Sequence, residues 1–357
     1  MILNNIKQIN KLDNNNVAES IQLFCNQIQQ VLEDADSITI PREYKNITQI
    51  VINGMGGSNL GAGIVKSVFN DQIKAPISIT PGYAVFNNIN KNTLYFVVSY
   101  SGATEEPLSV FHAVKKQKAK IIGITSRNAK SKLMKIMLKD NIPGYIFNAK
   151  YNPSGKPHFG LGYSIFGIIA MLSKAGLLEI KLDKMQNIIS FLKKQNKKLI
   201  SEIKLDDNIA KKIAVKLYEK QPIVVGAEFL TGNLRVLRNQ LCENSKNFAS
   251  YLILPDLNHY AMEGLANPKS NKKNLIFFFL DSKLYHPRVQ KRSALTKQVI
   301  KNSNIQVINH QLTGKTKLEQ SLEALQLSSW IAFYLAMLNN TNPANVPIVD
   351  WFKKKLR

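Results

Sequence analysis

The sequence predicts an α/β protein with two doubly wound, parallel-sheet domains joined by a helical segment. Three observations predict this fold class. A strand, a glycine turn and a helix start follow one another over residues 46–65. Short apolar strands then alternate with helical segments, which is typical of a parallel sheet. The same alternation begins again at residue 222, after a polar helical stretch.

The first half is expected to open with a helix over 17–35, ahead of the strand and glycine turn. Further strands are predicted at 76–80, 93–99, 120–126 and 144–147, with a helix at 107–119. The run 159–178 is nearly uncharged, but it contains four glycines and Lys174. Its unbroken apolar core is shorter than the roughly 20 residues that a membrane span needs, so a buried helix is expected.

The second half follows one or two helices within 176–220. Strands are predicted at 222–226, 250–254, 275–280 and 305–309, with a helix at 228–246. The expected organisation has four parts, which are an N-terminal helical extension (1–45), a first domain (46–175), a helical linker (176–220) and a second domain with a C-terminal helix (221–357).

Composition restricts the classes of function. The net charge of +24 invites a nucleic-acid interpretation, but the lysines are dispersed and not interleaved with aromatic residues. We therefore expect no nucleic-acid partner and no membrane association. The two cysteines form no disulfide framework and the N-terminus lacks the features of a signal peptide, so a cytoplasmic location is expected.

The glycine turn Gly54-Met55-Gly56-Gly57-Ser58 is the first candidate binding element. A helix that begins there points its free N–H groups and its positive dipole end at the space over the turn, which suits a phosphate. The dinucleotide fingerprint is incomplete because Asn59 replaces its third glycine, and no Walker A lysine follows. Close packing between strand and helix remains the alternative.

Hydroxyl groups gather at the end of the strand 93–99. Ser99, Ser101 and Thr104 lie between this strand and the next helix, and their hydroxyls can donate to phosphate oxygens. Helix capping alone would explain Thr104, but it is a weaker explanation for all three. The second half has Gly226-Ala227-Glu228 at the corresponding turn. Only the first half therefore keeps an obvious phosphate cradle.

These two segments together resemble the signature of the sugar isomerase (SIS) domain. The segments Leu241-Cys242-Glu243-Asn244-Ser245-Lys246 and Leu254-Pro255-Asp256-Leu257-Asn258-His259 are similar to motifs of the bifunctional phosphoglucose/phosphomannose isomerases, as is Asp350-Trp351-Phe352-Lys353. The resemblance runs from residue 46 to the end of the chain. It implies two flavodoxin-like SIS domains, an aldose-ketose isomerase acting on 6-phosphosugars without metal or cofactor, and a homodimer with a shared active site.

The resemblance also implies roles for individual residues. Glu243 would move the proton between C1 and C2, His259 would open the sugar ring from the partner subunit, and Lys353 would lie at the sugar. The phosphate would be held by Gly56, Gly57, Ser58, Ser99, Ser101 and Thr104. A carboxylate suits proton transfer when burial raises its pKa, and a histidine titrates near the working pH.

Two segments depart from the family pattern. His158 stands where the family has an arginine that would stabilise the enediolate, with Lys156 nearby as a substitute, and Tyr260 and Ala261 alter the family's Asn-His-Asn-Glu. The alternative function is therefore a non-catalytic sugar-phosphate sensor, or an isomerase of another phosphosugar.

Taken singly, the residues also have plainer interpretations. Glu243 and Lys246 could form a surface ion pair, and Lys353 could be one of several equivalent tail lysines. His259 and Glu263 could be a metal pair, but no third ligand appears.

Overall fold

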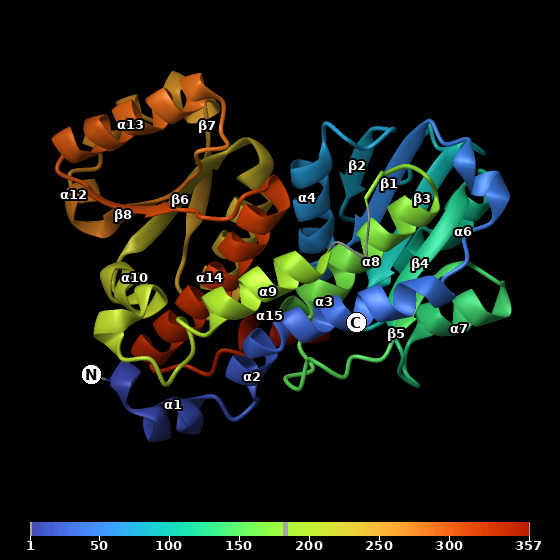
Figure 1. Ribbon diagram of the computed structural model, residues 1–357, viewed down its shortest axis with the longest axis horizontal. Helices are drawn as coiled ribbons and strands as arrows, with labels where there is room; N and C mark the ends of the chain where they lie inside the picture. Colours follow the sequence, from blue (N-terminus) through green and yellow to red (C-terminus); the bar gives the residue numbers. More distant parts are fainter. Residues whose placement is uncertain (1, 181–184, 357) are drawn as a thin grey trace. The chain divides into compact units, whose positions relative to one another are not determined.

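The computed structural model describes residues 2–180 and 185–356. The chain forms two compact units, one of residues 23–190 and the other of residues 1–22 together with 191–357 (Figure 1). The first 22 residues therefore pack with the second half of the chain.

The first unit is built on a five-stranded sheet in the order β2-β1-β3-β4-β5, and all neighbouring strands are parallel. Its strands are β1 (Gln49–Gly54), β2 (Ile77–Thr80), β3 (Thr93–Ser99), β4 (Lys120–Ser126) and β5 (Gly144–Phe147). This is the flavodoxin-like order, in which ligands bind beyond the carboxyl ends of the strands at the point where the order reverses. The predicted fold of the first domain is confirmed.

Helices cover both faces of this sheet. They are α3 (Phe24–Asp34), α4 (Gly57–Phe69), α5 (Glu105–Ser109), α6 (Phe111–Lys116), α7 (Lys132–Lys139) and α8 (Leu161–Lys174), with 3₁₀ turns η2 (Ala35–Ser37), η3 (Arg42–Lys45) and η4 (Pro157–Phe159). Helix α8 packs against α3 and α4. The run 159–178 is thus a buried helix, as predicted, because twelve of the fourteen residues of α8 are buried.

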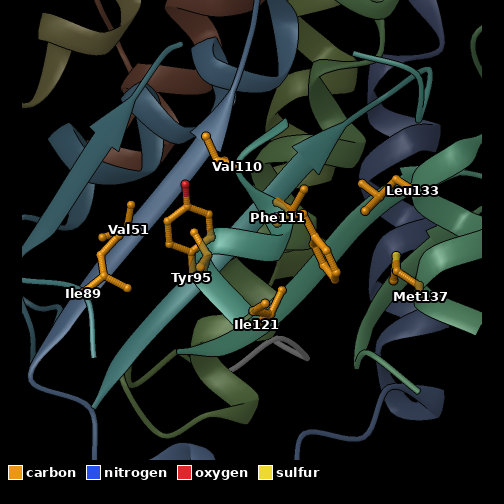
Figure 2. Close-up of a cluster of buried hydrophobic side chains, with 10 residues drawn as sticks. Val51, Ile89, Tyr95, Val110, Phe111, Ile121, Leu133 and Met137 are labelled. Atoms are coloured by element: carbon orange, nitrogen blue, oxygen red, sulfur yellow. The ribbon is translucent and has the colours of Figure 1, made fainter. Parts of the chain in front are cut away.

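The opposite face of the sheet carries a continuous apolar cluster (Figure 2). Alternate side chains of the strands, among them Val51, Tyr95 and Ile121, meet residues of α6 and α7 such as Phe111 and Met137. Successive side chains of a strand point to opposite faces, so a strand that is covered on both faces is apolar throughout. All seven residues of β3 are buried for this reason.

The second unit contains a four-stranded parallel sheet in the order β7-β6-β8-β9. Its strands are β6 (Gln221–Ala227), β7 (Ser250–Leu254), β8 (Leu275–Asp281) and β9 (Gln306–Gln311). The strand order repeats the first four strands of the other sheet, so the prediction of two related parallel sheets is confirmed.

The helices of the second unit include three that the sequence analysis did not predict, at Asn271–Asn274, Pro287–Asn302 and Lys317–Leu338. The unit's helices are α1 (Ile6–Leu12), α2 (Val17–Gln22), α10 (Ile209–Leu217), α11 (Thr231–Glu243), α12 (Asn271–Asn274), α13 (Pro287–Asn302), α14 (Lys317–Leu338) and α15 (Pro347–Lys355), with 3₁₀ turns η1 (Ile2–Asn4), η6 (Leu205–Asp207), η7 (Glu228–Leu230), η8 (Asp256–His259) and η9 (Glu263–Ala266). Helix α9 (Met185–Asn196) contains the boundary between the units.

Helix α14 is the centre of this unit and packs against α10, α11 and α2. By length and composition it could cross a membrane, but 94% of its apolar window is buried inside the protein. A helix that is apolar all round is typical of a core position as well as of a membrane span.

A buried cation ties the N-terminal segment to this core. The Lys211 ammonium donates to the carbonyl oxygens of Leu3 (2.6 Å), Ser201 (2.7 Å) and Ile203 (2.6 Å). It also lies over the ring of Tyr334, 5.2 Å from the centroid. Burial lowers the pKa of Lys211, while the negative charge of Glu202 raises it, and the three carbonyls and the ring give the ammonium polar partners inside the protein.

Replacing Lys211 with methionine should destabilise the fold. The change keeps an unbranched apolar stem but leaves three carbonyl acceptors without their donor, which should cost on the order of 3 kcal/mol of unfolding free energy. Urea denaturation measures this loss, with Lys212→Met as the control because Lys212 is exposed on the same helix. Equal stabilities of the two variants would contradict the anchoring role of Lys211.

Candidate active site

The glycine turn between β1 and α4 forms an open cradle. Gly56 has a φ of +51°, and nothing lies within 4 Å of where its Cβ would be. This conformation favours glycine and leaves room over the helix N-terminus. A Cβ on Gly57 would stand 2.8 Å from the carbonyl oxygen of Pro157. The segment around η4 therefore packs directly on the turn, and only glycine allows that approach.

The predicted hydroxyl groups lie around this turn and bond to one another. The backbone N–H of Tyr100 donates to Ser58 Oγ (3.2 Å), which links the first turn to the end of β3. The Oγ of Ser99 and the Oγ1 of Thr104 are 2.7 Å apart. Because the Ser58 oxygen acts as an acceptor, its hydroxyl hydrogen can be donated to an anion. Ser101 is exposed, and its Oγ accepts from Ala103 N at 3.3 Å.

His158 lies beside the cradle. It is buried at 8% exposure, its Cα would be 3.2 Å from a Cβ on Gly57, and its ring is 4.4 Å from that of Phe159. The amide of Asn152 steadies this segment by donating to Tyr100 Oη (2.7 Å) and to the carbonyl of Lys156 (2.9 Å). Burial raises the pKa of Tyr100 to about 12, so its hydroxyl stays protonated.

The corresponding crevice of the second unit is filled by a side chain. The hydroxyl of Tyr285 accepts from Ala227 N (3.1 Å) and donates to the carbonyl of Leu280 (3.0 Å). Glu228 Oε1 accepts from His286 N at 3.0 Å. A carboxylate side chain in this turn would repel a phosphate, whereas the turn Gly54–Ser58 of the first unit carries no charged side chain.

Glu243 ends helix α11 and is partly buried. Burial raises the pKa of its carboxyl group, while the positive charges of Lys353, Lys246 and Arg238 act to lower it, Lys353 most strongly. The result is a carboxyl group that is easier to protonate than usual and is surrounded by cations. Such a group is suited to accept and return a proton.

Lys353 is therefore distinguished from the other tail lysines. It is exposed on α15, yet its charge lowers the pKa of Glu243 more strongly than the charges of Lys246 and Arg238 do. Apart from the motif to which it belongs, the sequence offers no reason to choose this lysine of the tail.

His259 lies at the exposed end of η8. The preceding Asn258 holds this turn, since its amide donates to Thr296 Oγ1 (2.7 Å) and accepts from Arg292 Nη1 (3.3 Å). The second unit thus brings the charge of Lys353 to Glu243, while His259 is exposed to solvent.

The sequence analysis missed Arg238. Its guanidinium lies 5.2 Å from the ring centroid of Tyr251, its Nε donates to Asn239 Oδ1 (2.8 Å), and its charge acts on Glu243. The only available signal was its place on the helix that ends at Glu243. An ion pair of Lys246 with Glu243 is the plainer interpretation from sequence; in the structure the charge of Lys246 acts on Glu243, and its ammonium donates to the carbonyls of Asn244 (3.1 Å) and Asn342 (2.7 Å).

The described ranges 2–180 and 185–356 contain no candidate metal-binding cluster. No group of three histidine, cysteine or carboxylate side chains there is arranged to hold an ion.

Comparisons with known proteins identify relatives of this chain in sequence and in fold. A family model for the bacterial phospho-glucose isomerase C-terminal SIS domain matches residues 206–356. Solved structures with the same fold include the C-terminal domain of glucosamine-fructose-6-phosphate aminotransferase from Francisella tularensis (TM-score 0.69, 14% identity, covering 92% of this chain and 96% of that chain). Another is tagatose-6-phosphate ketose/aldose isomerase from Escherichia coli (TM-score 0.64, 13% identity, 96% and 95%).

Sequence relatives are similar over nearly their whole length. The bifunctional phosphoglucose/phosphomannose isomerase of Caldicellulosiruptor bescii is 30% identical over 95% of this chain and 98% of its own. The protein of the same name from Aquifex aeolicus is 28% identical over 86% and 90%. The chain therefore belongs to the family of bifunctional phosphoglucose/phosphomannose isomerases.

Proposed function

We propose that this protein interconverts fructose 6-phosphate and glucose 6-phosphate and, after rotation of the opened sugar, mannose 6-phosphate. The observation that carries the proposal is Glu243, a partly buried carboxyl group with a raised pKa and three cations of its own unit acting on it. Membership of the isomerase family supports it. The reaction that the family resemblance implies needs no metal.

The cradle of the first unit is proposed to hold the phosphate. Gly56 and Gly57 present the N-terminus of α4, where backbone N–H groups and the helix dipole attract an anion. Ser58 and Thr104 add hydroxyl donors to the same turn. Ser99 orients Thr104, and exposed Ser101 lies at the rim.

Glu243 is proposed to move the proton. Its carboxylate removes the proton from C2 of the open aldose, the C1–C2 double bond forms, and the carbonyl oxygen at C1 gains the electron pair. The hydroxyl proton on O2 then moves to O1, the carbonyl forms at C2, and the same carboxyl group returns its proton to C1, which gives the ketose. Negative charge develops on the enediolate oxygens, and the nearby Lys353 ammonium is the cation proposed to balance it.

A second copy of the chain is proposed to complete the site. Every residue of α15 is exposed, including Ile348 (81%), Trp351 (61%) and Phe352 (54%). Exposed aromatic and aliphatic side chains on one short helix are typical of a surface that another protein covers. A partner copy there agrees with the homodimer implied by the resemblance, and His259 of the partner would then open the ring.

His158 favours a second candidate, a sugar-phosphate sensor without turnover. The family's arginine is always charged, whereas a buried imidazole carries a charge only when protonated. In the proposed isomerase, Lys353 supplies the positive charge that the family's arginine would provide, so His158 does not need to be protonated for catalysis.

An assay with fructose 6-phosphate separates the two candidates. The purified protein, with a chelator present, should form glucose 6-phosphate and mannose 6-phosphate, detected separately. Thermal stabilisation by 6-phosphosugars without any product would instead support the sensor, and His158→Arg would then be expected to restore turnover.

Removing the cation next to Glu243 should shift the pH dependence. Glu243 acts as a base only when ionised, so kcat/KM falls as the pH drops through its raised pKa. Lys353 lowers that pKa, so Lys353→Met should move the acidic limb to higher pH, while Lys354→Met should leave it in place. A pH profile with an unshifted limb in Lys353→Met would contradict the assignment.

A further inference from the structure

The turn after Glu243 is tied to the segment that leads into α15. The Lys246 ammonium bridges the carbonyl oxygens of Asn244 (3.1 Å) and Asn342 (2.7 Å). Close by, the amide of Asn339 donates to the carbonyl of Ser245 (2.8 Å). Two polar links therefore join the end of α11 to the connection between α14 and α15.

Asn342 is the centre of these links. Its Oδ1 accepts from the backbone N–H groups of Ala344 (2.8 Å) and Asn345 (3.2 Å), which shapes the turn ahead of α15. Its Nδ2 donates to the N-terminal segment, with partners Leu12 O (2.9 Å), Asn14 Oδ1 (2.6 Å) and Asn15 Oδ1 (3.1 Å). Three distant parts of the sequence thus meet at one side chain.

Helix α15 needs such a fixed starting point. None of its residues is buried, so packing against the rest of the chain holds it only weakly. Pro343 and Ala344, just before it, are buried, and Asn342 holds the turn around them. The position of Lys353 relative to Glu243 then depends on where α15 begins.

We infer that Lys246 and Asn342 form a junction that positions Lys353 against the base Glu243. The inference rests on the proposed function in one respect, namely that Glu243 is the base. Lys246 is a positioning residue in this arrangement, because its ammonium is occupied by two carbonyls and acts on the reaction through α15. The N-terminal segment takes part as the third arm of the junction.

The backbone at Lys246 allows the contact to be removed without damage to the fold. Its φ is +54°, a left-handed conformation that glycine adopts more easily than lysine. Lys246→Gly removes the ammonium and relieves the backbone at the same time. Lys118 gives a matched control, since it is exposed and has a φ of +61° in the other unit.

The experiment compares Lys246→Gly, Lys246→Met and Lys246→Arg with Lys118→Gly. Displacing Lys353 should lower kcat for fructose 6-phosphate by about 10- to 100-fold in the first two variants, with KM changed less than twofold. Arginine keeps the charge and the donors and should restore most of kcat. The thermal midpoint of Lys246→Gly should stay equal to or above that of the parent, as for Lys118→Gly.

Two further readouts follow the junction, and the second separates positioning from the direct effect of the Lys246 charge. Lys246→Met removes a charge that acts on Glu243 and also loosens the anchor of Lys353, so the acidic limb of kcat/KM should move to higher pH. Hydrogen exchange of the α15 amides should become faster in Lys246→Gly and stay unchanged in Lys118→Gly. Unchanged kcat and unchanged exchange in Lys246→Gly would overturn the inference.

The exchange measurement does not depend on turnover. If the parent converts no sugar, the proposed function fails, and faster exchange of α15 in Lys246→Gly still establishes the junction. If the parent is active and Lys246→Gly leaves hydrogen exchange in α15 unchanged, the proposed junction is contradicted while the proposed function stands.

Discussion

Replacing Glu243 with glutamine is expected to remove turnover while the protein keeps its fold and its phosphate binding. Glutamine has nearly the same shape but cannot accept a proton from C2 of the sugar. Loss of a general base costs roughly 10²- to 10⁴-fold in rate, and no other carboxylate is proposed to take over its role. Because the phosphate cradle lies at the glycine turn of β1, thermal stabilisation by 6-phosphosugars should persist.

The stability of this variant is a second check. Burial raises the pKa of Glu243, so ionising this carboxyl group costs more free energy in the folded protein than in the unfolded chain. A raised pKa in the folded state means that stability is lost as the pH rises through that value. Glutamine removes the titration, so its thermal midpoint at neutral pH should equal or exceed that of the parent.

A matched variant shows that the effect is local. Glu202 is exposed in the same unit, and Glu202→Gln should leave kcat unchanged. Turnover of Glu243→Gln within threefold of the parent would show that another group is the base. A loss of turnover with an equally large loss of folding would leave Glu243 with a structural role instead.

The strands could be predicted well because both sheets are covered on both faces. Residues 93–99, 120–126 and 250–254 form strands with the bounds expected from sequence. Their apolar runs are short and are flanked by turn residues, which separates them from helices. The predicted helix at 107–119 is instead divided into α5 and α6 at Val110.

Helix α14 could not be recognised in the same way. It is buried on nearly every side, so its polar residues do not gather on one face and the helical period is hidden. Buried Gln320, Ser321 and Glu323 bond to neighbouring loops and helices rather than to water. These contacts join residues that are far apart in the sequence or lie in loops. A local sequence pattern therefore does not predict them.

In the candidate site, too, the sequence predicts some residues and not others. Motifs identify Glu243, Lys353 and the cradle, because each is a short run with a recognisable order of residue types. Of the cations that act on Glu243, Lys246 and Lys353 belong to motifs that the sequence shows, whereas Arg238 does not. No motif indicates that the Lys246 ammonium reaches Asn342, 96 residues away.

Mixed dimers provide the sharpest test of a shared site. Two chains with different tags, one carrying Glu243→Gln and the other His259→Ala, are each expected to be inactive as homodimers. If His259 serves the partner's Glu243, the purified heterodimer contains one intact site and should recover about half of the parental turnover. If both residues serve their own chain, neither site is intact and no activity returns.

The reverse pairing gives the opposite result and serves as the control. A chain carrying both substitutions is combined with a parental chain. A shared site leaves this heterodimer inactive, because the parental Glu243 lacks its histidine and the parental His259 faces a glutamine. Sites within single chains would instead retain about half of the turnover. The exposed apolar residues of α15 make association of the two chains the expected starting point, and light scattering that found only monomers would contradict the shared site directly.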